Sequence, residues 1–330
     1  MTPGGTHPRD ALFDSARTPR ALPVVDHYSG VEARMRKSLE LQAARGPVFD
    51  VTLDAEDGAP VGGEVEHAQL MAELIGSADN RFGRVGARIL PVGHAKFHAV
   101  LEAVLRAARR PAYLMLPKPA GLADVERAAR AIDAAGGADI PLHALVETHG
   151  ALRDVFAIAA HPRIESLSFG LMDFVSAHAG AIPLAGMTVQ GQFSHPLVVR
   201  AKLEIAAACH AAGKTPSHCV VTEFKHRAAL QAAAERAADE FGYTRMWSIH
   251  PDQIEPIIDA FSPSTAEVDL AIEILAAAQA ADWAPIRHRD TLHDRASYRF
   301  FWHVLERAHR TGQPLPAEVR AAWFDDTPRP

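Results

Sequence analysis

The stretch "LHALVETHGALRDVFAIAAHPRIESLSFGLMDF" (residues 142–174) decides the fold class. It begins and ends with short apolar segments, which enclose residues 151–161 with the spacing of a helix. Such a strand–helix–strand unit places its two strands parallel to each other. Glu147 follows the first strand directly, and Asp173 comes three residues after the second. The two acids are therefore expected at the same edge of a parallel sheet.

The alternation of strand and helix extends along most of the chain. Besides the two strands of the quoted unit, the second of which spans 163–170, five further strands are expected at 47–58, 87–92, 112–118, 217–224 and 245–251. The long helices are expected at 64–77, 95–110, 122–137, 195–214 and 226–242. No G-x-G-x-x-G follows the first of these strands, which argues against a dinucleotide-binding sheet. Seven or eight such units predict an α/β fold, a TIM (β/α)8 barrel with a C-terminal helical extension.

Three regions follow from this pattern. Residues 1–45 are expected to form an N-terminal arm and a leading helix, and residues 46–264 the barrel. Residues 265–330 lose the alternation and are expected to form a helical extension or lid. Within that extension, helices are expected at 269–281 and 298–310 with a polar segment between them.

Composition excludes several classes of protein. A hydrophobic fraction of 48% with 22% charged residues is typical of a globular chain. A formal charge of −6 without a long Lys/Arg run argues against a nucleic-acid partner. No run of eighteen apolar residues and no signal-peptide pattern is present, which argues against a membrane partner. The two cysteines form no CxxC pair, so a reducing, cytoplasmic location is expected.

Charged residues cluster at the carboxyl ends of the expected strands, where TIM barrels carry their chemistry. They are Asp54, Glu56, Asp57, Arg88, Lys118, Glu147, Asp173, Glu223 and His250. Any one of them alone is more often a solvated or salt-bridged residue, but acids and bases together suit a divalent cation with an anionic substrate. Mg²⁺ takes one or two carboxylates and completes its octahedron with water and substrate. Glu147 and Asp173 are the candidate pair. A Schiff-base role for Lys118 is the second interpretation.

Short motifs in this order resemble a known family. They are "DAEDG" (54–58), "ARIL" (87–90), "LPKP" (116–119), "VETHGAL" (146–152), "FGLMDF" (169–174) and "SIHPDQIEPIIDAFSPS" (248–264). Over about residues 45–300 the chain resembles the citrate lyase beta-subunit and malyl-CoA lyase proteins of the HpcH/HpaI aldolase superfamily. The resemblance implies a TIM barrel that cleaves or forms a carbon–carbon bond in a 3-hydroxyacyl thioester such as malyl-, citramalyl- or citryl-CoA.

The same resemblance implies roles for particular residues. Glu147 and Asp173 would bind Mg²⁺, and Arg88 would contact the acid and thioester oxygens of the substrate. Asp54, Glu56 and Lys118 would line the substrate site, with Asp54 placed to orient Arg88. Asp294, in a C-terminal segment that covers a neighbouring subunit's site, would supply an acid. A homo-oligomer, trimeric or hexameric, is implied as well.

Two departures from the family pattern leave alternatives open. Leu90 stands where the family has an asparagine after Arg88, and "DTLHD" (290–294) keeps only Asp294 of a glycine-rich motif. One alternative is a metal-dependent aldolase that acts on free 2-keto acids without CoA. The other is a catalytically silent homologue that serves as a ligand-binding subunit or scaffold.

Overall fold

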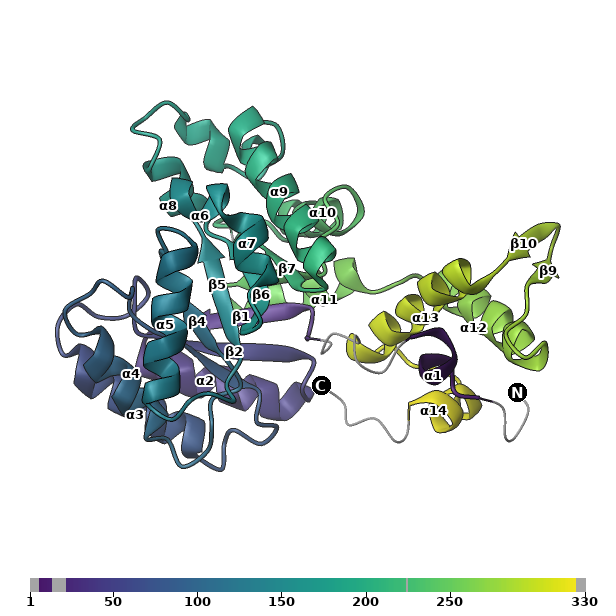
Figure 1. Cartoon of the computed structure of the whole chain (residues 1–330), viewed down its shortest axis with the longest axis horizontal. Coiled ribbons are helices and arrows are strands. Elements are labelled where there is room, and N and C mark those ends of the chain that lie inside the picture. The colour runs from purple at the N-terminus through teal and green to yellow at the C-terminus, as the bar shows by residue number, and fades with distance from the viewer. Residues whose placement is uncertain (1–5, 14–21, 224, 325–330) are drawn as a thin grey trace. The chain divides into compact units, whose positions relative to one another are not determined.

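Eight parallel strands close into a barrel in the order of the sequence, and helices follow them on the outside (Figure 1). The structure is a computed structural model that describes residues 6–13, 22–223 and 225–324. The strands are β1 Val25–Ser29, β2 Phe49–Asp54, β3 Val85–Arg88, β4 Leu114–Leu116, β5 Leu142–Val146, β6 Ile164–Phe169, β7 Thr215–His218 and β8 Arg245–Ser248. The predicted TIM barrel is confirmed.

The helices of the barrel connect consecutive strands, except for the last helix, which follows β8. They are α2 Glu32–Arg45, α3 Glu64–Gly76, α4 Phe97–Leu105, α5 Leu122–Ala134, α6 His149–Arg153, α7 Val155–Ala160, α8 Leu171–Ser176, α9 Pro196–Ala212, α10 Arg227–Asp239 and α11 Ile254–Phe261. Three 3₁₀ turns, Leu184–Met187 (η1), Gly191–Phe193 (η2) and Pro251–Gln253 (η3), lie in the loops after β6 and β8. Within the described ranges, no helix is long and apolar enough to cross a membrane.

The chain divides into two compact units, residues 22–260 and residues 1–21 with 261–330. The second unit contains α1 Pro8–Leu12, α12 Thr265–Ala280, the hairpin β9 Ile286–His288 and β10 Thr291–His293, α13 Arg295–Arg310 and α14 Ala317–Trp323. It has a hydrophobic core of its own, in which Tyr298, Trp302 and Leu305 are buried. A capping box between Ser264 and Glu267 starts α12 four residues before the predicted helix.

The first barrel strand, β1, lies inside the segment 1–45 that was expected to be an arm and a leading helix. That expectation was wrong for residues 25–29, and the strand predicted at 47–58 is the second of the barrel. Asp26 and His27 interrupt the apolar pattern of β1, although both are buried. The polar segment expected at 287–297 forms most of the β9–β10 hairpin and the start of α13.

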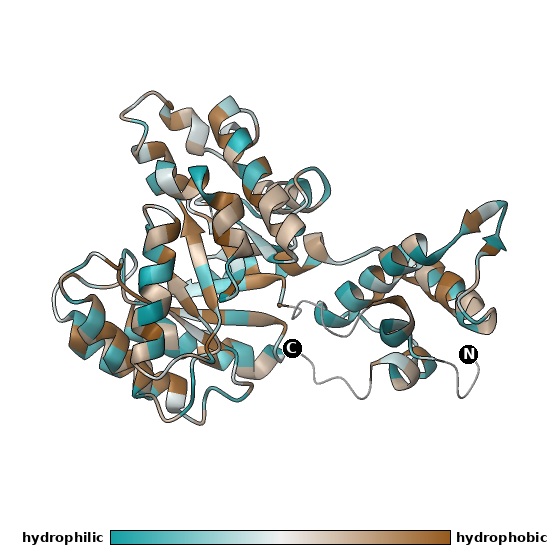
Figure 2. Ribbon diagram, in the orientation of Figure 1, coloured by the Kyte–Doolittle hydropathy of each residue, from teal (hydrophilic) through white to brown (hydrophobic). Residues whose placement is uncertain are grey.

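Buried charges explain how a strand with an aspartate fits the barrel. Arg245 of β8 donates to Asp50 Oδ2 of β2 at 2.6 Å and lies 3.2 Å from Asp26 Oδ2 of β1. Arg84 donates to the other Asp50 oxygen at 2.7 Å. Because three strands contribute to one network, these side chains meet in the barrel interior. Hydrophilic residues accordingly interrupt the hydrophobic strands in Figure 2.

Replacing Arg245 by methionine is expected to lower the free energy of unfolding by about 3–5 kcal/mol, because it removes the counter-ion of the buried Asp26 carboxylate and leaves Asp50 with Arg84 alone. Equilibrium urea denaturation measures this loss. The matched control is Arg36→Met, which breaks an exposed pair with Glu32 on α2 and should cost no more than about 0.5 kcal/mol. Equal losses in the two variants would contradict a structural role for the buried network.

Candidate active site

Glu147 and Asp173 follow neighbouring strands of the barrel. Glu147 comes directly after β5, and Asp173 lies in the first turn of α8 after β6. The register pairs Val146 with Phe169, so both acids belong to the same rim. Glu147 is only 3% exposed, whereas the side chain of Asp173 is 41% exposed. Burial, and then the charge of Asp173, raises the pKa of Glu147 from 4.5 to about 8. A cation bound between these two carboxyl groups would compensate their negative charge.

Glu147 is fixed in position by backbone on two sides. Its Oε1 accepts a hydrogen bond from the backbone N–H of Lys118 at 2.8 Å. On the other side, a Cβ built on Gly170 would lie 2.1 Å from Glu147 Oε2 and 2.6 Å from its Cβ. The glycine of "FGLMDF" is therefore required because the Glu147 carboxyl occupies the space that a side chain would take. The sequence pointed to the acid of this motif, and the structure adds the reason for its glycine.

Arg88, the last residue of β3, is clamped by Asp54, the last residue of β2. Its Nε donates to Asp54 Oδ1 at 2.6 Å and its Nη2 to Asp54 Oδ2 at 2.5 Å. Burial alone would lower the pKa of Arg88, but the charge and hydrogen bonds of Asp54 outweigh it and raise that pKa, so the guanidinium stays charged. Nη1 lies 3.3 Å from Glu56 Oε2. Asp54 thus occupies one edge of the guanidinium, and Glu56 lies beside Nη1.

Each carboxylate oxygen of Asp54 already accepts two hydrogen bonds from the protein. Besides both bonds from Arg88, it accepts from the backbone N–H of Glu56 at 2.9 Å and of Gly58 at 2.8 Å. This geometry favours the narrower of the two roles that the resemblance implied, which is the orientation of Arg88. Direct contact between Asp54 and substrate is not what this geometry favours.

Lys118 connects three of the predicted site residues. It has a left-handed backbone with φ of 48°, and its Nζ donates to Glu56 at 2.6 Å and to Asp57 at 2.7 Å. Asp173 Oδ1 lies 3.7 Å from the same nitrogen. Partial burial works to lower the pKa of Lys118, but the bonds to the two acids outweigh it and raise that pKa. A Schiff-base nucleophile must be neutral, so this charged environment argues against the second interpretation of Lys118, which stays an untested prediction.

Asp294 belongs to the other compact unit. Its Oδ1 caps α13 by accepting from the backbone N–H groups of Ala296 and Ser297 at 2.9 and 3.3 Å. Within its own unit, Asp294 thus serves as the N-cap of α13 in a capping box. Its role as an acid in a neighbouring subunit's site stays a prediction.

The electrostatic balance of the rim is acidic. Two cations, Arg88 and Lys118, face five carboxyl groups, those of Asp54, Glu56, Asp57, Glu147 and Asp173. Among the described residues, no group of three or more His, Cys, Asp or Glu side chains is arranged as a complete metal cage. A pair of carboxylates at an open rim is the arrangement that suits Mg²⁺, because this ion keeps several waters or substrate oxygens as ligands.

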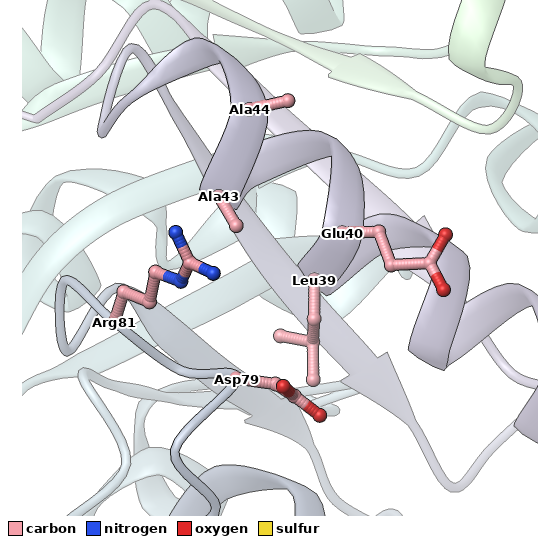
Figure 3. Close-up of a pocket in the computed structure, with 6 residues that line it drawn as sticks. All are labelled: Leu39, Glu40, Ala43, Ala44, Asp79 and Arg81. Carbon is pink, nitrogen blue, oxygen red and sulfur yellow. The ribbon is translucent and has the colours of Figure 1, made fainter.

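Two hollows lie away from these residues. One, of about 280 Å³, is lined by Leu39, Glu40, Ala43 and Ala44 of α2 together with Asp79 and Arg81. Figure 3 shows Arg81 beside Ala43 of this helix and Asp79 beside Leu39. The other, of about 480 Å³, lies between residues 189–193 and α10. Neither is lined by Glu147, Asp173 or Arg88, so neither is the site at the strand ends.

Curated relatives share the sequence at moderate identity. A (3S)-malyl-CoA thioesterase of Cereibacter sphaeroides is 28% identical over 251 residues, which cover 74% of this chain and 81% of that protein. An L-malyl-CoA/beta-methylmalyl-CoA lyase of Rhodobacter capsulatus is 31% identical over 199 residues, which cover 56% of this chain and 62% of that protein. No protein-family profile matches the chain.

Solved structures extend the likeness to nearly the whole chain. A citrate lyase of Burkholderia xenovorans LB400 is 54% identical, with a TM-score of 0.83 over 96% of this chain and 100% of that one. A citrate lyase beta subunit of Mycobacterium tuberculosis, complexed with oxaloacetate and magnesium, shares the fold at 24% identity and a TM-score of 0.60, over 74% of this chain and 99% of that one. The chain therefore belongs to the citrate lyase beta-subunit and malyl-CoA lyase family of carbon–carbon lyases.

Proposed function

We propose that this protein is a Mg²⁺-dependent lyase that cleaves or forms a carbon–carbon bond in a 3-hydroxyacyl thioester such as malyl-, citramalyl- or citryl-CoA. The observation that carries the proposal is the buried carboxyl of Glu147, whose pKa is raised to about 8 beside Asp173. The relatives named for malyl-CoA and the magnesium complex of the M. tuberculosis protein support it.

The donors present fit Mg²⁺. Glu147 and Asp173 are hard oxygen donors at one rim, and the space left by Gly170 admits the Glu147 carboxyl. These two residues would bind the ion. When bound, Mg²⁺ supplies Lewis-acid polarisation and a template for the substrate's oxygens.

The chain's own residues account for the remaining chemistry. In the cleavage direction the 3-hydroxyl would give up its proton to solvent and become the carbonyl oxygen of one product. The bond between C2 and C3 would break, and its electron pair would stay on the thioester fragment as an enolate. Nη1 of Arg88, which Glu56 contacts at 3.3 Å here, would stabilise the negative charge that develops on the thioester oxygen, a contribution of roughly 3 kcal/mol. Asp54 maintains the orientation of Arg88. An acid then protonates C2 of the enolate, and Asp294 of a neighbouring subunit is the candidate.

Lys118 has a positioning role in this proposal. Its backbone N–H holds Glu147, and its ammonium neutralises Glu56 and Asp57. We further propose that the protein works as a homo-oligomer, because the acid would come from a second copy. Sedimentation of the purified protein tests this, and a monomer with full activity would contradict it.

A product assay separates the possible reactions. The protein is incubated with Mg²⁺ and malyl-, citramalyl- or citryl-CoA, and separately with free 4-hydroxy-2-keto acids. Release of glyoxylate, pyruvate or oxaloacetate together with an intact acyl thioester supports the proposed lyase. Free thiol with an intact hydroxy acid would show a thioesterase instead. Cleavage of the free acids alone would show a keto-acid aldolase, and no turnover of any substrate would favour the scaffold.

Gly170→Ala is expected to weaken Mg²⁺ binding by about 10- to 100-fold, because the new methyl group displaces the Glu147 carboxyl without removing it. Calorimetric titration of Mg²⁺ measures the change. Gly93→Ala is the matched control, since nothing lies within 4 Å of a Cβ at that glycine. An unchanged affinity in Gly170→Ala would contradict the assignment of Glu147 as a ligand.

A further inference from the structure

An aromatic pair lies in the barrel interior near the candidate site. Tyr28 of β1 stacks on Trp247 of β8, with ring centroids 4.4 Å apart and 24° between the ring planes. Met115 of β4 and Leu145 of β5 complete the same buried cluster. Tyr28 and Trp247 are 7% and 8% exposed. Large side chains from four strands thus form one packed layer.

This layer meets the site through Arg88. The Cζ atom of Arg88 lies 5.5 Å from the centroid of the Tyr28 ring, within the range of a cation–π contact. Asp54 contacts the guanidinium along one edge through two hydrogen bonds. Two bonds along one edge restrain the group in its plane but leave it free to tilt about that edge. An aromatic ring beside the guanidinium restricts that tilt.

The ring of Tyr28, and not its hydroxyl, makes this contact. The hydroxyl oxygen is buried and has no hydrogen-bond partner among the residues that the structure describes. Trp247 packs against the ring at stacking distance, so the ring cannot move away from Arg88 without disrupting the pair.

We infer that Tyr28, backed by Trp247, is a positioning residue that fixes the orientation of the Arg88 guanidinium for its interaction with the substrate. The catalytic part of this inference rests on the proposed function. Its structural part, the restraint of Arg88 by an aromatic ring, can be measured without turnover.

The structural test is the ¹H–¹⁵N NMR signal of the Arg88 Nε–H group, assigned by its loss in Arg88→Lys. In the wild type and in Tyr28→Phe, the neighbouring ring should shift this signal and slow its exchange with solvent. In Tyr28→Leu the ring-current shift should disappear and exchange should accelerate. Tyr113→Leu is the control, because it also removes a buried tyrosine ring of the barrel. The hydroxyl of Tyr113 contacts Asp26 and Thr52.

The catalytic test compares kcat and KM in the same variants. Tyr28→Leu should lower kcat by about 10- to 30-fold with little change in KM. This is the loss expected when the cation–π contact between the Tyr28 ring and Arg88 is removed from a desolvated site. Tyr28→Phe should restore kcat to within about threefold of the wild type. Thermal unfolding of each variant shows whether the fold is retained.

Three results would overturn the inference. These are an unchanged Arg88 signal in Tyr28→Leu, an unchanged kcat in that variant, and an equal loss in Tyr28→Phe, which would assign the effect to the hydroxyl. If the wild type cleaves no carbon–carbon bond, the proposed function fails, and the Arg88 signal alone still decides whether Tyr28 restrains the arginine.

Discussion

Glu147→Gln is expected to abolish Mg²⁺-dependent turnover, lowering kcat/KM by about 1,000-fold or more, because a bound metal contributes several kcal/mol of transition-state stabilisation. Glutamine keeps the size of the side chain and can still accept the hydrogen bond from the Lys118 backbone. The fold should therefore survive, and a loss of turnover reports on the charge. Initial rates over a range of Mg²⁺ concentrations measure the effect.

The protonation of Glu147 supplies a second readout for the same variant. In the metal-free protein its pKa is about 8, whereas the ordinary value is 4.5. Between these two pH values the native state retains a proton that the unfolded chain has lost, so the metal-free stability falls as the pH rises through this window. Above pH 8 both states are deprotonated and the fall ends. Glu147→Gln should remove this dependence, and Mg²⁺ binding below pH 8 should release about one proton in the wild type only.

The control for Glu147→Gln is Asp252→Asn, which removes a carboxyl after β8 whose side chain is 81% exposed. It should leave the kinetics unchanged. Turnover by Glu147→Gln at the wild-type rate would remove Glu147 from the site.

Arg88→Lys is expected to lower kcat/KM by about 100-fold, the loss typical of removing one preorganised donor to a developing oxyanion. Lysine keeps a positive charge beside the buried Asp54 carboxylate, so the fold is protected from an unpaired charge. It cannot reproduce the paired bonds of the guanidinium or present a second nitrogen in a fixed direction. Mg²⁺ affinity should stay at the wild-type value, because Arg88 is not a metal ligand.

Steady-state kinetics and a Mg²⁺ titration on Arg88→Lys separate the two roles. A large loss of turnover with unchanged metal binding supports the assignment. Parallel losses of both would mean that Arg88 acts through the architecture of the rim and not on the substrate's oxygen.

The barrel was predictable because most of its strands are short apolar runs, as in Leu142–Val146, and each is followed by a helical pattern. The strand β1 was not predictable in this way. Its Asp26 is tolerated inside the barrel only because Arg245 lies beside it, and these residues are more than 200 positions apart in the sequence. Local patterns carry no information about such a distant partner.

The helix predicted at 151–161 shows a smaller version of the same limit. In the structure it is divided into α6 and α7 at Asp154. The Asp154 carboxylate accepts a hydrogen bond from the backbone N–H of Leu122, at the start of α5. A contact to another part of the chain again accounts for a feature that spacing alone did not indicate.

The acids of the site were identifiable because each follows a strand of the parallel sheet. Glu147, Asp173 and the cations Arg88 and Lys118 do lie at one rim. The contacts that position these side chains were not identifiable from the sequence, because they involve the backbone of other segments. Examples are the space above Gly170 and the bond from the Lys118 N–H to Glu147. Tyr28 escaped notice because it lies 60 residues before Arg88 in a strand that the pattern did not indicate.

Calorimetric titration of Mg²⁺, with and without oxaloacetate, on the wild type and on Glu147→Gln tests the central claim most directly. The claim is that a carboxylate pair at the carboxyl ends of β5 and β6 binds a divalent ion together with a keto acid. It predicts Mg²⁺ binding that strengthens in the presence of oxaloacetate in the wild type and is lost in the variant. Equal binding by both proteins, or no binding by the wild type under either condition, would contradict it.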